Sequence, residues 1–436
     1  MTTSGLVDDI DSWRARTAAQ QPPWPDAEAL RAVVDELSLA PPLVLPAECD
    51  RLRDRLAAVA RGEGFVLQGG DCAELFDHVS ADRIGGKVLT LLRMALVLSY
   101  GGSTPVVRIG RIAGQYAKPR SAATETRGGV TLPAYRGDIA NDVVFGAAER
   151  ALDPRRLARA YHASATTLNL LRGFLASGAS RAEPVHAGFP TPALERDRRT
   201  LADIGSALRF LRAWERAGAG EPELYTSHEA LVLDYESALS RPHADGWYDT
   251  SAHMVWIGER TRGLDGAHVE FASRIANPIG VKLGPTADAD DVLALVDRLD
   301  PERVPGRLTF IARMGASLVR EALPPLVEKV TASGAAVVWL CDPMHGNTVT
   351  APSGHKTRLV SDVLAEVTGF FEVHRELGTH PGGLHVEMTG DDVTECVGGA
   401  VSAADLPLRY ESACDPRLNG DQALDLAFRG AELLRG

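Results

Sequence analysis

The chain has 436 residues, 45% of them hydrophobic, and its 46 basic and 58 acidic residues give a net charge of −12. This length holds one large α/β barrel with additions or two to three ordinary domains. The composition is that of a globular protein and excludes a disordered chain. The negative charge disfavours nonspecific binding to nucleic acid and to anionic membranes, so we expect neither as a partner.

The N-terminus, the longest apolar stretch and the cysteines together predict a cytoplasmic protein. The first residues, MTTSGLVDDIDSW, have neither the basic region nor the apolar region of a signal peptide. The longest apolar stretch, Val88 to Tyr100, contains Arg93. It is shorter than the roughly 20 residues of a membrane span, which favours a buried core helix. The five cysteines are scattered without a CxxC pair, which indicates a reducing compartment.

Three helical patterns occupy the start of the chain. They span residues 9–20, 25–39 and 46–62, with a proline at the start of the second and a glycine at the end of the third. Proline in a first turn and glycine after a last turn are typical helix boundaries. We therefore predict an N-terminal helical extension over residues 1–62, either a packed cap or an arm that contacts a partner.

From residue 63 onward, short apolar runs alternate with helical patterns. Runs of about five apolar residues that end in glycine or a polar cluster are typical of buried parallel strands. Amphipathic patterns separate several of them, at residues 288–299, 317–333 and 357–377. Eight strands with helices outside predict a (β/α)8 TIM barrel over residues 63–436. The candidate runs are FVLQGG, PVVRIG, HMVWIGER, HVEFASR, IGVKLGP, LTFIARMG, AVVWLCDP and GLHVEMTG.

Two connections do not fit an ideal barrel. The link between HVEFASR and IGVKLGP is very short for a parallel crossover, and residues 111–252 are far too long for one. The long connection predicts inserted helices, a helical subdomain at about residues 150–220. Within it, the segment YTSHEALVLDYE fits a helix, a strand or an active-site loop, and the sequence does not decide among them.

Cationic residues follow several of the predicted strands. Arg111, Lys118, Arg120 and Ser121 lie within eleven residues after the second candidate strand. A single arginine or lysine more often belongs to a solvated face or a salt bridge. A set at the strand ends of an acidic chain is typical of a site for several anionic groups, because arginine binds carboxylate or phosphate bidentately and lysine binds as a point charge. The later members of this set are Arg260, Lys282, Arg313 and Lys356.

Four residues far apart in the sequence have side chains that bind metals. Cys72 follows the first candidate strand, His345 lies in CDPMHGN, Glu387 in HVEMTG and Asp415 in ACDPRLN. Each of them alone is more often structural. A thiolate, an imidazole and two carboxylates around one ion combine hard and borderline donors, which suits Mn²⁺, Co²⁺, Fe²⁺ or Zn²⁺.

Eight longer segments occur together and in a fixed order. They are QGGDCAE, VVRIGRIAGQYAKPRS, YRGDI, SAHMVWIGERTRGLDGAHVEF, GVKLGPT, DPMHGNT, GTHPGGLHVEMTGDDVTEC and YESACDPRLN. Over about residues 63–420 the chain closely resembles the type II (plant-like) 3-deoxy-D-arabino-heptulosonate 7-phosphate (DAHP) synthases. The resemblance implies a (β/α)8 barrel with an N-terminal extension. It also implies metal-dependent condensation of phosphoenolpyruvate with D-erythrose 4-phosphate and water, the first step of the shikimate pathway.

The resemblance also assigns roles to residues. It implies metal ligands at Cys72, His345, Glu387 and Asp415, with Mn²⁺ or Co²⁺ as the favoured cofactor. Phosphoenolpyruvate contacts fall on Arg111 and Lys118 for the carboxylate, and on Glu259, Arg260, Lys282 and Arg313 for the phosphate, with Glu259 acting through its backbone. The aldose phosphate contacts fall on Lys118, Arg120 and Ser121, with Lys356 as a further candidate. The implied catalytic residues are Lys118, Lys282, Arg313 and His345.

A mechanism follows from two anionic substrates and one divalent ion in a pocket. The ion polarises the aldose carbonyl, carbon 3 of the enol phosphate attacks it, water adds at carbon 2, and inorganic phosphate leaves. The general acid or base stays open among a metal-bound water, Lys118 and Glu387.

Alternative functions remain open at this stage. The same chemistry on an iminoerythrose 4-phosphate would make an aminoDAHP synthase of a specialised pathway. A 3-deoxy-octulosonate 8-phosphate synthase shares the barrel and mechanism but lacks the RIAGQYAKPRS and DPMHGNT wording. A catalytically silent barrel that binds a chorismate mutase is a third hypothesis. Relatives also suggest a homo-oligomer, dimer or tetramer, with chorismate mutase as a partner.

The remaining cysteines and histidines have modest predicted roles. Cys396 and Cys414 lie close in sequence to presumed ligands, so a reversible redox pair is conceivable, although two reduced core thiols are the simpler interpretation. We place His253, His380 and His385 near the site as supporting or structural residues.

Overall fold

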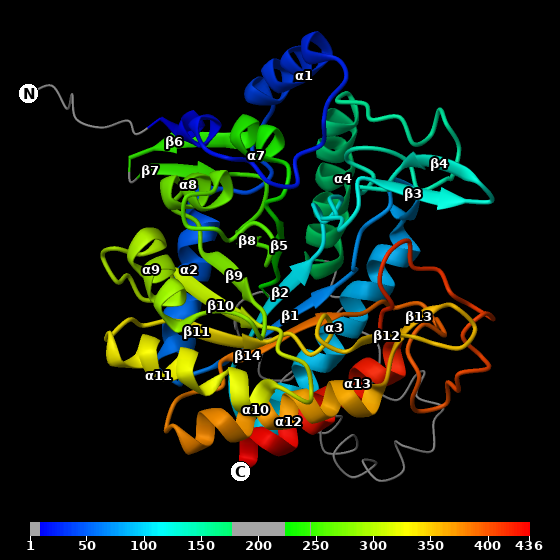
Figure 1. Ribbon diagram of the computed structural model, residues 1–436. Coiled ribbons are helices and arrows are strands. Elements are labelled where there is room, and N and C mark those ends of the chain that lie inside the picture. The colour runs from blue at the N-terminus through cyan, green and yellow to red at the C-terminus, as the bar shows by residue number, and fades with distance from the viewer. Residues whose placement is uncertain (1–8, 177–222, 245) are drawn as a thin grey trace, which may run out of the picture.

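The computed structural model describes residues 9–176, 223–244 and 246–436, with eight parallel strands at its centre (Figure 1). They form a closed barrel, so the (β/α)8 fold predicted from the sequence is confirmed. The barrel strands are β1 (Phe65–Gly70), β2 (Val106–Arg111), β5 (Tyr225–Glu229), β8 (Met254–Ile257), β9 (Ile279–Leu283), β10 (Leu308–Ala312), β11 (Val338–Cys341) and β14 (Gly383–Glu387). Around the ring they follow the order β1, β14, β11, β10, β9, β8, β5, β2, and β2 pairs with β1.

The register of the barrel brings the ends of distant segments together. Strand β1 pairs with both neighbours so that Gly70 lies opposite Arg111 on one side and Glu387 on the other. Strands such as β9 and β10 are buried along their whole length, as expected for strands covered on both faces. Residues that follow the carboxyl ends of these strands therefore share one face of the barrel.

Helices surround the strands (Figure 1). The predicted apolar helix is longer than its sequence pattern, because α3 spans the 22 residues Ala81–Gly102. Length and composition alone would allow α3 to cross a membrane, but Val88, Leu91 and Leu98 are buried and the helix packs against α13 and β2 as a core helix. The other helices are α4 (Arg156–Ala176), α7 (Leu233–Leu239), α8 (Ala267–Arg274), α9 (Ala289–Leu299), α10 (Val319–Ala322), α11 (Pro324–Ala332), α12 (Val360–Glu376) and α13 (Gly420–Arg435).

The start of the chain contains a short 3-10 helix and two α-helices, η1 (Ile10–Ala15), α1 (Ala27–Leu39) and α2 (Pro46–Ala60), where the three helical patterns lie. Asp26 caps α1 by accepting from the N–H groups of Glu28 and Ala29, and Pro46 begins α2. The apolar residues of α2, Leu52, Leu56 and Val59, pack with core residues from the barrel interior such as Val66 and Ile109. Helix α2 thus covers the amino end of the barrel.

One strand assignment from the sequence is wrong. The run HVEFASR forms helix α8, and the eighth strand is β5, with the sequence YTSHE. The short connection that did not fit a crossover is therefore the link from α8 to β9 and needs no helix. Strand β5 lacked an apolar pattern because Thr226, Ser227 and His228 are polar yet fully buried within the barrel wall.

Three two-stranded hairpins lie outside the barrel sheet. They are β3 (Thr124–Arg127) with β4 (Val130–Pro133), β6 (Ser240–His243) with β7 (Gly246–Asp249), and β12 (Thr348–Thr350) with β13 (Lys356–Arg358). Of the predicted inserted subdomain at about residues 150–220, the structure describes α4 up to residue 176, and residues 177–220 lie outside the described ranges.

Candidate active site

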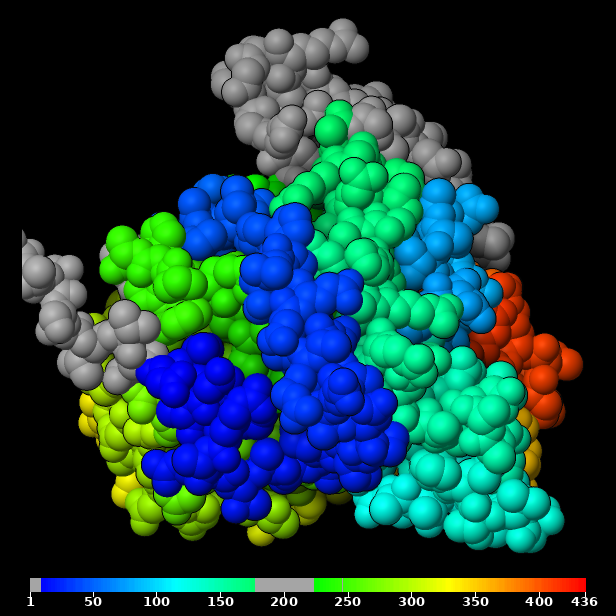
Figure 2. Space-filling model, turned by 90° about the horizontal axis from the view of Figure 1, so that it is seen from above, coloured from blue at the N-terminus to red at the C-terminus, as the bar shows by residue number. Residues whose placement is uncertain are grey.

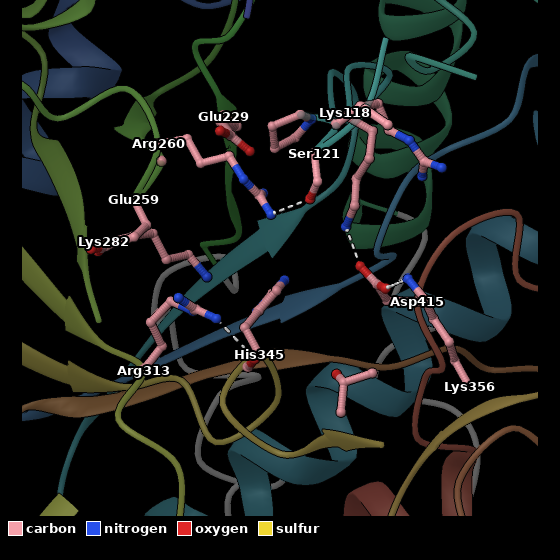
Figure 3. Close-up of a pocket in the computed structure, with 15 residues that line it drawn as sticks. Lys118, Ser121, Glu229, Glu259, Arg260, Lys282, Arg313, His345, Lys356 and Asp415 are labelled. Carbon is pink, nitrogen blue, oxygen red and sulfur yellow. Dashed lines mark hydrogen bonds and ion pairs between the residues drawn. The ribbon is translucent and has the colours of Figure 1, made fainter. Parts of the chain in front are cut away.

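A cavity of about 480 Å³ opens at the carboxyl ends of the barrel strands (Figure 3). Its lining comes from the carboxyl ends of β5 and β9 and from segments that follow β2, β8, β10 and β11. Further residues come from the β12–β13 hairpin and the loop before α13. The residues predicted from the sequence that line it are Lys118, Arg120, Ser121, Glu259, Arg260, Lys282, Arg313, His345, Lys356 and Asp415.

One end of the cavity is built around a buried lysine. Lys282 lies in β9, is 5% exposed and forms an ion pair with Asp342. Burial lowers the pKa of Lys282 to about 8, the charge of Arg111 adds to this effect, and the carboxylate of Asp342 opposes it. Arg313 follows β10 and donates from Nη2 to the carbonyl of His345 over 2.9 Å. The side chain of Glu259 accepts from the N–H of Gly284 over 2.6 Å and so supports the neighbouring loop.

The other end of the cavity is formed by the loop that follows β2. Ser121 accepts a hydrogen bond of 3.0 Å from Nη2 of Arg260, so the two ends meet at the rim (Figure 3). Lys356 is exposed and places its ammonium 3.0 Å from Oδ1 of Asp415. Arg120 lines the cavity and is half-buried. This end therefore combines a lysine, an arginine and a hydroxyl in more solvated surroundings.

The four predicted metal ligands lie around the ammonium of Lys118. Its Nζ is 2.9 Å from Sγ of Cys72, 2.8 Å from Oδ2 of Asp415 and 4.0 Å from Oε1 of Glu387. His345 completes the group, with Nε2 3.0 Å from the same oxygen of Glu387. Burial alone would lower the pKa of Lys118, but the charges of Asp415, Cys72 and Glu387 raise it well above its usual value. The four donors therefore surround a place that favours positive charge.

The donors are not spaced as in a preformed metal site. Cys72 Sγ lies 3.8 Å from Asp415 Oδ2, and among the described residues no three His, Cys, Asp or Glu side chains are already grouped as such a site. The donor chemistry nevertheless fits a divalent ion of the Mn²⁺ to Zn²⁺ series. Asp342 accepts from Nδ1 of His345 at 2.7 Å, which directs Nε2 toward Glu387, as carboxylates do behind metal-binding histidines. The residues present fit the cofactor.

Arg111 does not line the cavity. It is 2% exposed and lies beneath the donors, where Nη2 is 3.0 Å from Oε1 of Glu387 and Nε donates to the carbonyl of Asp71 over 3.1 Å. Arg358 binds the other oxygen of Glu387 over 2.8 Å. Both arginines hold Glu387 in place. Burial alone would raise the pKa of that carboxyl, but His345, Arg358 and Lys118 keep it well below its usual value.

Sequence reasoning missed three residues of this site. Glu229, at the end of β5, lines the cavity, is 8% exposed, and its Oε1 has no hydrogen-bond partner. Burial raises the pKa of Glu229, and the nearby charges of Lys118 and Lys282 oppose that effect only in part. Asp342 and Arg358 are the other two. The sequence contained a signal for two of them. Asp342 begins the DPMHGN segment, and Glu229 lies in YTSHEALVLDYE, the segment whose structure the sequence did not decide.

The three histidines divide between the two ends of the barrel. His385 lies within β14 beneath the cavity and bonds to Gln68 over 2.7 Å and to Arg111. His253 and His380 were expected near the site, but they lie at the amino ends of strands. There Nδ1 of His253 accepts from the N–H of Thr226 over 2.9 Å, and Nε2 of His380 lies 2.8 Å from the carbonyl of Gly64. That expectation was wrong, and their role is structural.

All five cysteines are free. Cys414 forms a hydrogen bond with Cys72, and that bond lowers the pKa of Cys414. Cys396 is fully buried, and burial raises its pKa to about 12. Cys414 therefore contacts the thiol of Cys72 rather than that of Cys396, the redox partner considered from the sequence.

Comparison with known proteins decides the family. The model of the class-II DAHP synthetase family matches residues 8–431. The chain belongs to the class-II DAHP synthetase family. It is thus a DAHP synthase, an enzyme of the shikimate pathway.

Two relatives match nearly the whole chain. A phospho-2-dehydro-3-deoxyheptonate aldolase of Streptomyces coelicolor is 60% identical over 98% of this chain and 97% of its own. The phospho-2-dehydro-3-deoxyheptonate aldolase AroG of Mycolicibacterium smegmatis is 51% identical over 98% of this chain and 94% of its own. The crystal structure of a DAHP synthase from Thermotoga maritima matches with a TM-score of 0.38 and 14% identity, over 85% of this chain and 69% of that one, a likeness too distant to bear on fold or function. Neither the aminoDAHP synthase nor the silent barrel is supported.

Proposed function

We propose that this DAHP synthase condenses phosphoenolpyruvate with D-erythrose 4-phosphate and water, and releases DAHP and inorganic phosphate, with a divalent metal ion as cofactor. One observation carries the proposal: a single cavity has cationic groups at both ends and His345 and Asp415 in its wall, with the two other metal-ligand candidates, Cys72 and Glu387, buried directly against them. Such a cavity suits two phosphorylated substrates whose reacting carbons meet at the ion.

Phosphoenolpyruvate would bind at the end that contains Lys282. This ammonium and the guanidinium of Arg313 would bind the phosphate, and Arg260 would close over it from the rim. The lowered pKa of Lys282 supports this role, because a buried ammonium is stabilised by an incoming dianion. Lys118 would take the carboxylate. Arg111, beneath the floor, would hold Glu387 and the backbone of Cys72 in place.

Erythrose 4-phosphate would bind at the other end. Arg120, Ser121 and Lys356 supply a guanidinium, a hydroxyl and an ammonium for its phosphate. The aldehyde would then lie over the donors between the two ends. This arrangement brings the aldehyde carbon next to carbon 3 of phosphoenolpyruvate.

The ion would be held by Cys72, His345, Glu387 and Asp415. Mn²⁺ or Co²⁺ suits this mixed set best, and Fe²⁺ and Zn²⁺ are the alternatives. When bound, such an ion supplies Lewis acidity to the aldehyde oxygen. The protein's own part is to fix the donors, and Asp342, Arg111 and Arg358 do this from behind.

Glu229 would move the proton of the attacking water. Carbon 3 of phosphoenolpyruvate forms the new carbon–carbon bond, and the aldehyde oxygen takes up one proton to become a hydroxyl. Water then adds at carbon 2 and passes one proton to Glu229, which replaces the proton taken up by the aldehyde oxygen. The carbon–oxygen bond to phosphate breaks, the second water proton leaves with the phosphate, and carbon 2 becomes a ketone. The position of Glu229 in the cavity wall and its raised pKa support this role, because a carboxylate with a raised pKa accepts a proton more readily.

We also propose that the enzyme works in the cytoplasm as a homo-oligomer, a dimer or a tetramer. The five free cysteines support a reducing compartment. Light scattering coupled to size-exclusion chromatography gives the number of subunits, and a monomer at micromolar concentration would contradict the proposal.

The reaction is tested by phosphate release. Purified enzyme with Mn²⁺ should release phosphate only when both substrates are present, one phosphate for each DAHP formed. Erythrose without its phosphate, ribose 5-phosphate and the imino analogue serve as comparison substrates. Phosphate release from phosphoenolpyruvate alone, or a faster reaction with another aldose, would contradict the proposed reaction.

A further inference from the structure

The residues that precede α1 lie over several loops at the active-site face of the barrel. We call residues 12–21 the N-terminal strap. Ser12 donates from Oγ to Glu270 over 2.8 Å, and the carbonyl of Thr17 accepts from the N–H of Ala267 over 3.1 Å, so the strap is fixed to α8. Figure 2 shows the N-terminal residues in blue, between the green segment that contains α7 and α8 and the cyan segment that contains β3 and β4.

Two successive glutamines at the end of the strap hold two different loops. Gln21 donates to the carbonyl of Leu231 over 2.6 Å and accepts from the N–H of Leu233 over 3.1 Å, which fixes the loop after β5. Gln20 binds the loop after β2. Its Oε1 accepts from the backbone N–H of Arg120 over 2.9 Å, so a residue of the extension bonds directly to the loop that forms the proposed aldose phosphate site.

The bond to Arg120 is part of a closed ring of contacts. The carbonyl of Gln20 accepts from Nη1 of Arg136 over 3.3 Å, and the carbonyl of Arg136 accepts from the N–H of Lys118 over 2.9 Å. The next residue, Gly137, packs so tightly that a Cβ there would lie 1.9 Å from the carbonyl oxygen of Tyr116. The loop is therefore fixed before and after Pro119, and both Lys118 and Arg120 line the cavity.

The backbone at Gln20 is in an uncommon conformation. Its φ of 62° lies in the left-handed region, which few residues other than glycine adopt. Glycine at this position would adopt the conformation with less strain. Backbone strain at a residue whose side chain bonds to a substrate loop is a pattern found where function requires that residue.

We propose that Gln20 is a positioning residue for the second substrate: by accepting the N–H of Arg120, it holds the Lys118–Ser121 loop where that loop binds the phosphate of erythrose 4-phosphate. This inference rests on the proposed function, because it uses the assignment of that loop to the aldose phosphate. The extension outside the barrel is then part of the substrate site.

The test uses full-length enzyme with Gln20→Gly and Gln20→Ala, the metal ion supplied, and KM measured for each substrate. Both variants should raise KM for erythrose 4-phosphate roughly three- to tenfold, the loss expected for one hydrogen bond. KM for phosphoenolpyruvate should change less than twofold. Gln20→Gly should melt at the wild-type temperature or above it, because glycine relieves the positive φ, whereas Gln20→Ala should not melt above wild type.

Gln21→Ala is the matched control. It removes the bonds to Leu231 and Leu233 but leaves the Arg120 bond, so it should lower the melting temperature without a selective change in KM for erythrose 4-phosphate. An unchanged KM for erythrose 4-phosphate in Gln20→Gly, or an equal rise in both KM values, would overturn the inference about Gln20 and leave the proposed function standing. A wild-type enzyme that does not turn over the two substrates would instead overturn the proposed function.

Discussion

The two ends of the cavity carry the same kind of charge in different surroundings. Lys282 is 5% exposed and pairs with Asp342, whereas the side chain of Lys356 is 52% exposed and pairs with Asp415. An exposed ion pair is screened by water and contributes little, whereas a buried charge depends strongly on its partners. We infer that phosphate affinity comes mainly from desolvated charge at the Lys282 end and from loop geometry at the other.

Glu229 lies between the two ends, so its loss should affect turnover and neither substrate's binding. Gln keeps the size of the side chain but accepts no proton. We expect Glu229→Gln to lower kcat roughly 10²- to 10⁴-fold, the usual contribution of a general base. Steady-state kinetics with both substrates varied checks this. A rise in one KM with unchanged kcat would place Glu229 in binding instead.

Cys72 is a proposed ligand of the metal ion between the two substrates, so its loss should affect the reaction of both. Cys72→Ala should lower metal affinity and activity together. Loss of a residue behind a metal ligand typically costs about 10- to 100-fold in affinity, so loss of a ligand should reach about 100-fold or more. Mn²⁺ titration followed by electron paramagnetic resonance measures the affinity. Cys49→Ala, a buried cysteine near Asn277 and far from the cavity, is the control; equal affinities in the two variants would refute the ligand assignment.

Lys282→Ala should weaken phosphoenolpyruvate binding. A charge-assisted contact contributes roughly 1.5–3 kcal/mol, so KM for phosphoenolpyruvate should rise about 10- to 150-fold. KM for erythrose 4-phosphate should change little. Lys329→Ala, which removes an exposed ion pair with Asp290, should leave both constants unchanged. If only the aldose kinetics respond to Lys282→Ala, the two ends have been assigned the wrong way round.

The same lysine predicts a pH dependence. Its pKa of about 8 means that the ammonium is charged below pH 8 and is progressively lost above it. The kcat/KM for phosphoenolpyruvate should therefore fall about tenfold per unit once the pH is well above 8. Lys282→Arg keeps its charge, because arginine does not deprotonate in this range, so the falling limb should move to higher pH. A limb that stays in place would assign the titration to another group.

Lys356→Ala completes the comparison with the smallest expected effect. An exposed pair typically contributes 0 to about 1 kcal/mol, so KM for erythrose 4-phosphate should rise about fivefold at most. The effect should shrink as the salt concentration increases. An effect as large as that of Lys282→Ala would remove the distinction between the two ends.

The barrel was predictable because its strands are short apolar runs with a simple period, and most helices between them are amphipathic. β5 was not, because a strand in which Thr226, Ser227 and His228 are polar yet buried lacks the apolar signal of a buried strand. α8 was mistaken for a strand because HVEFASR is too short to display a helical period.

The chemistry of the site was visible where one residue type reveals its role. A set of lysines and arginines at the strand ends of an acidic chain indicates an anion site, so Lys282 and Arg313, which line the cavity, were among the residues predicted. Roles that depend on a partner were not visible. Arg358 matters because it reaches Glu387, and Gln20 because it reaches Arg120 a hundred residues away.

The most direct test of the account is metal removal with both substrates present. Enzyme treated with chelator and then dialysed should lose its turnover of phosphoenolpyruvate and erythrose 4-phosphate. Added Mn²⁺ should restore that turnover to the wild-type enzyme but not to Cys72→Ala at the same concentration. Full turnover by the metal-free enzyme would contradict the central claim that Cys72, His345, Glu387 and Asp415 act together around one ion.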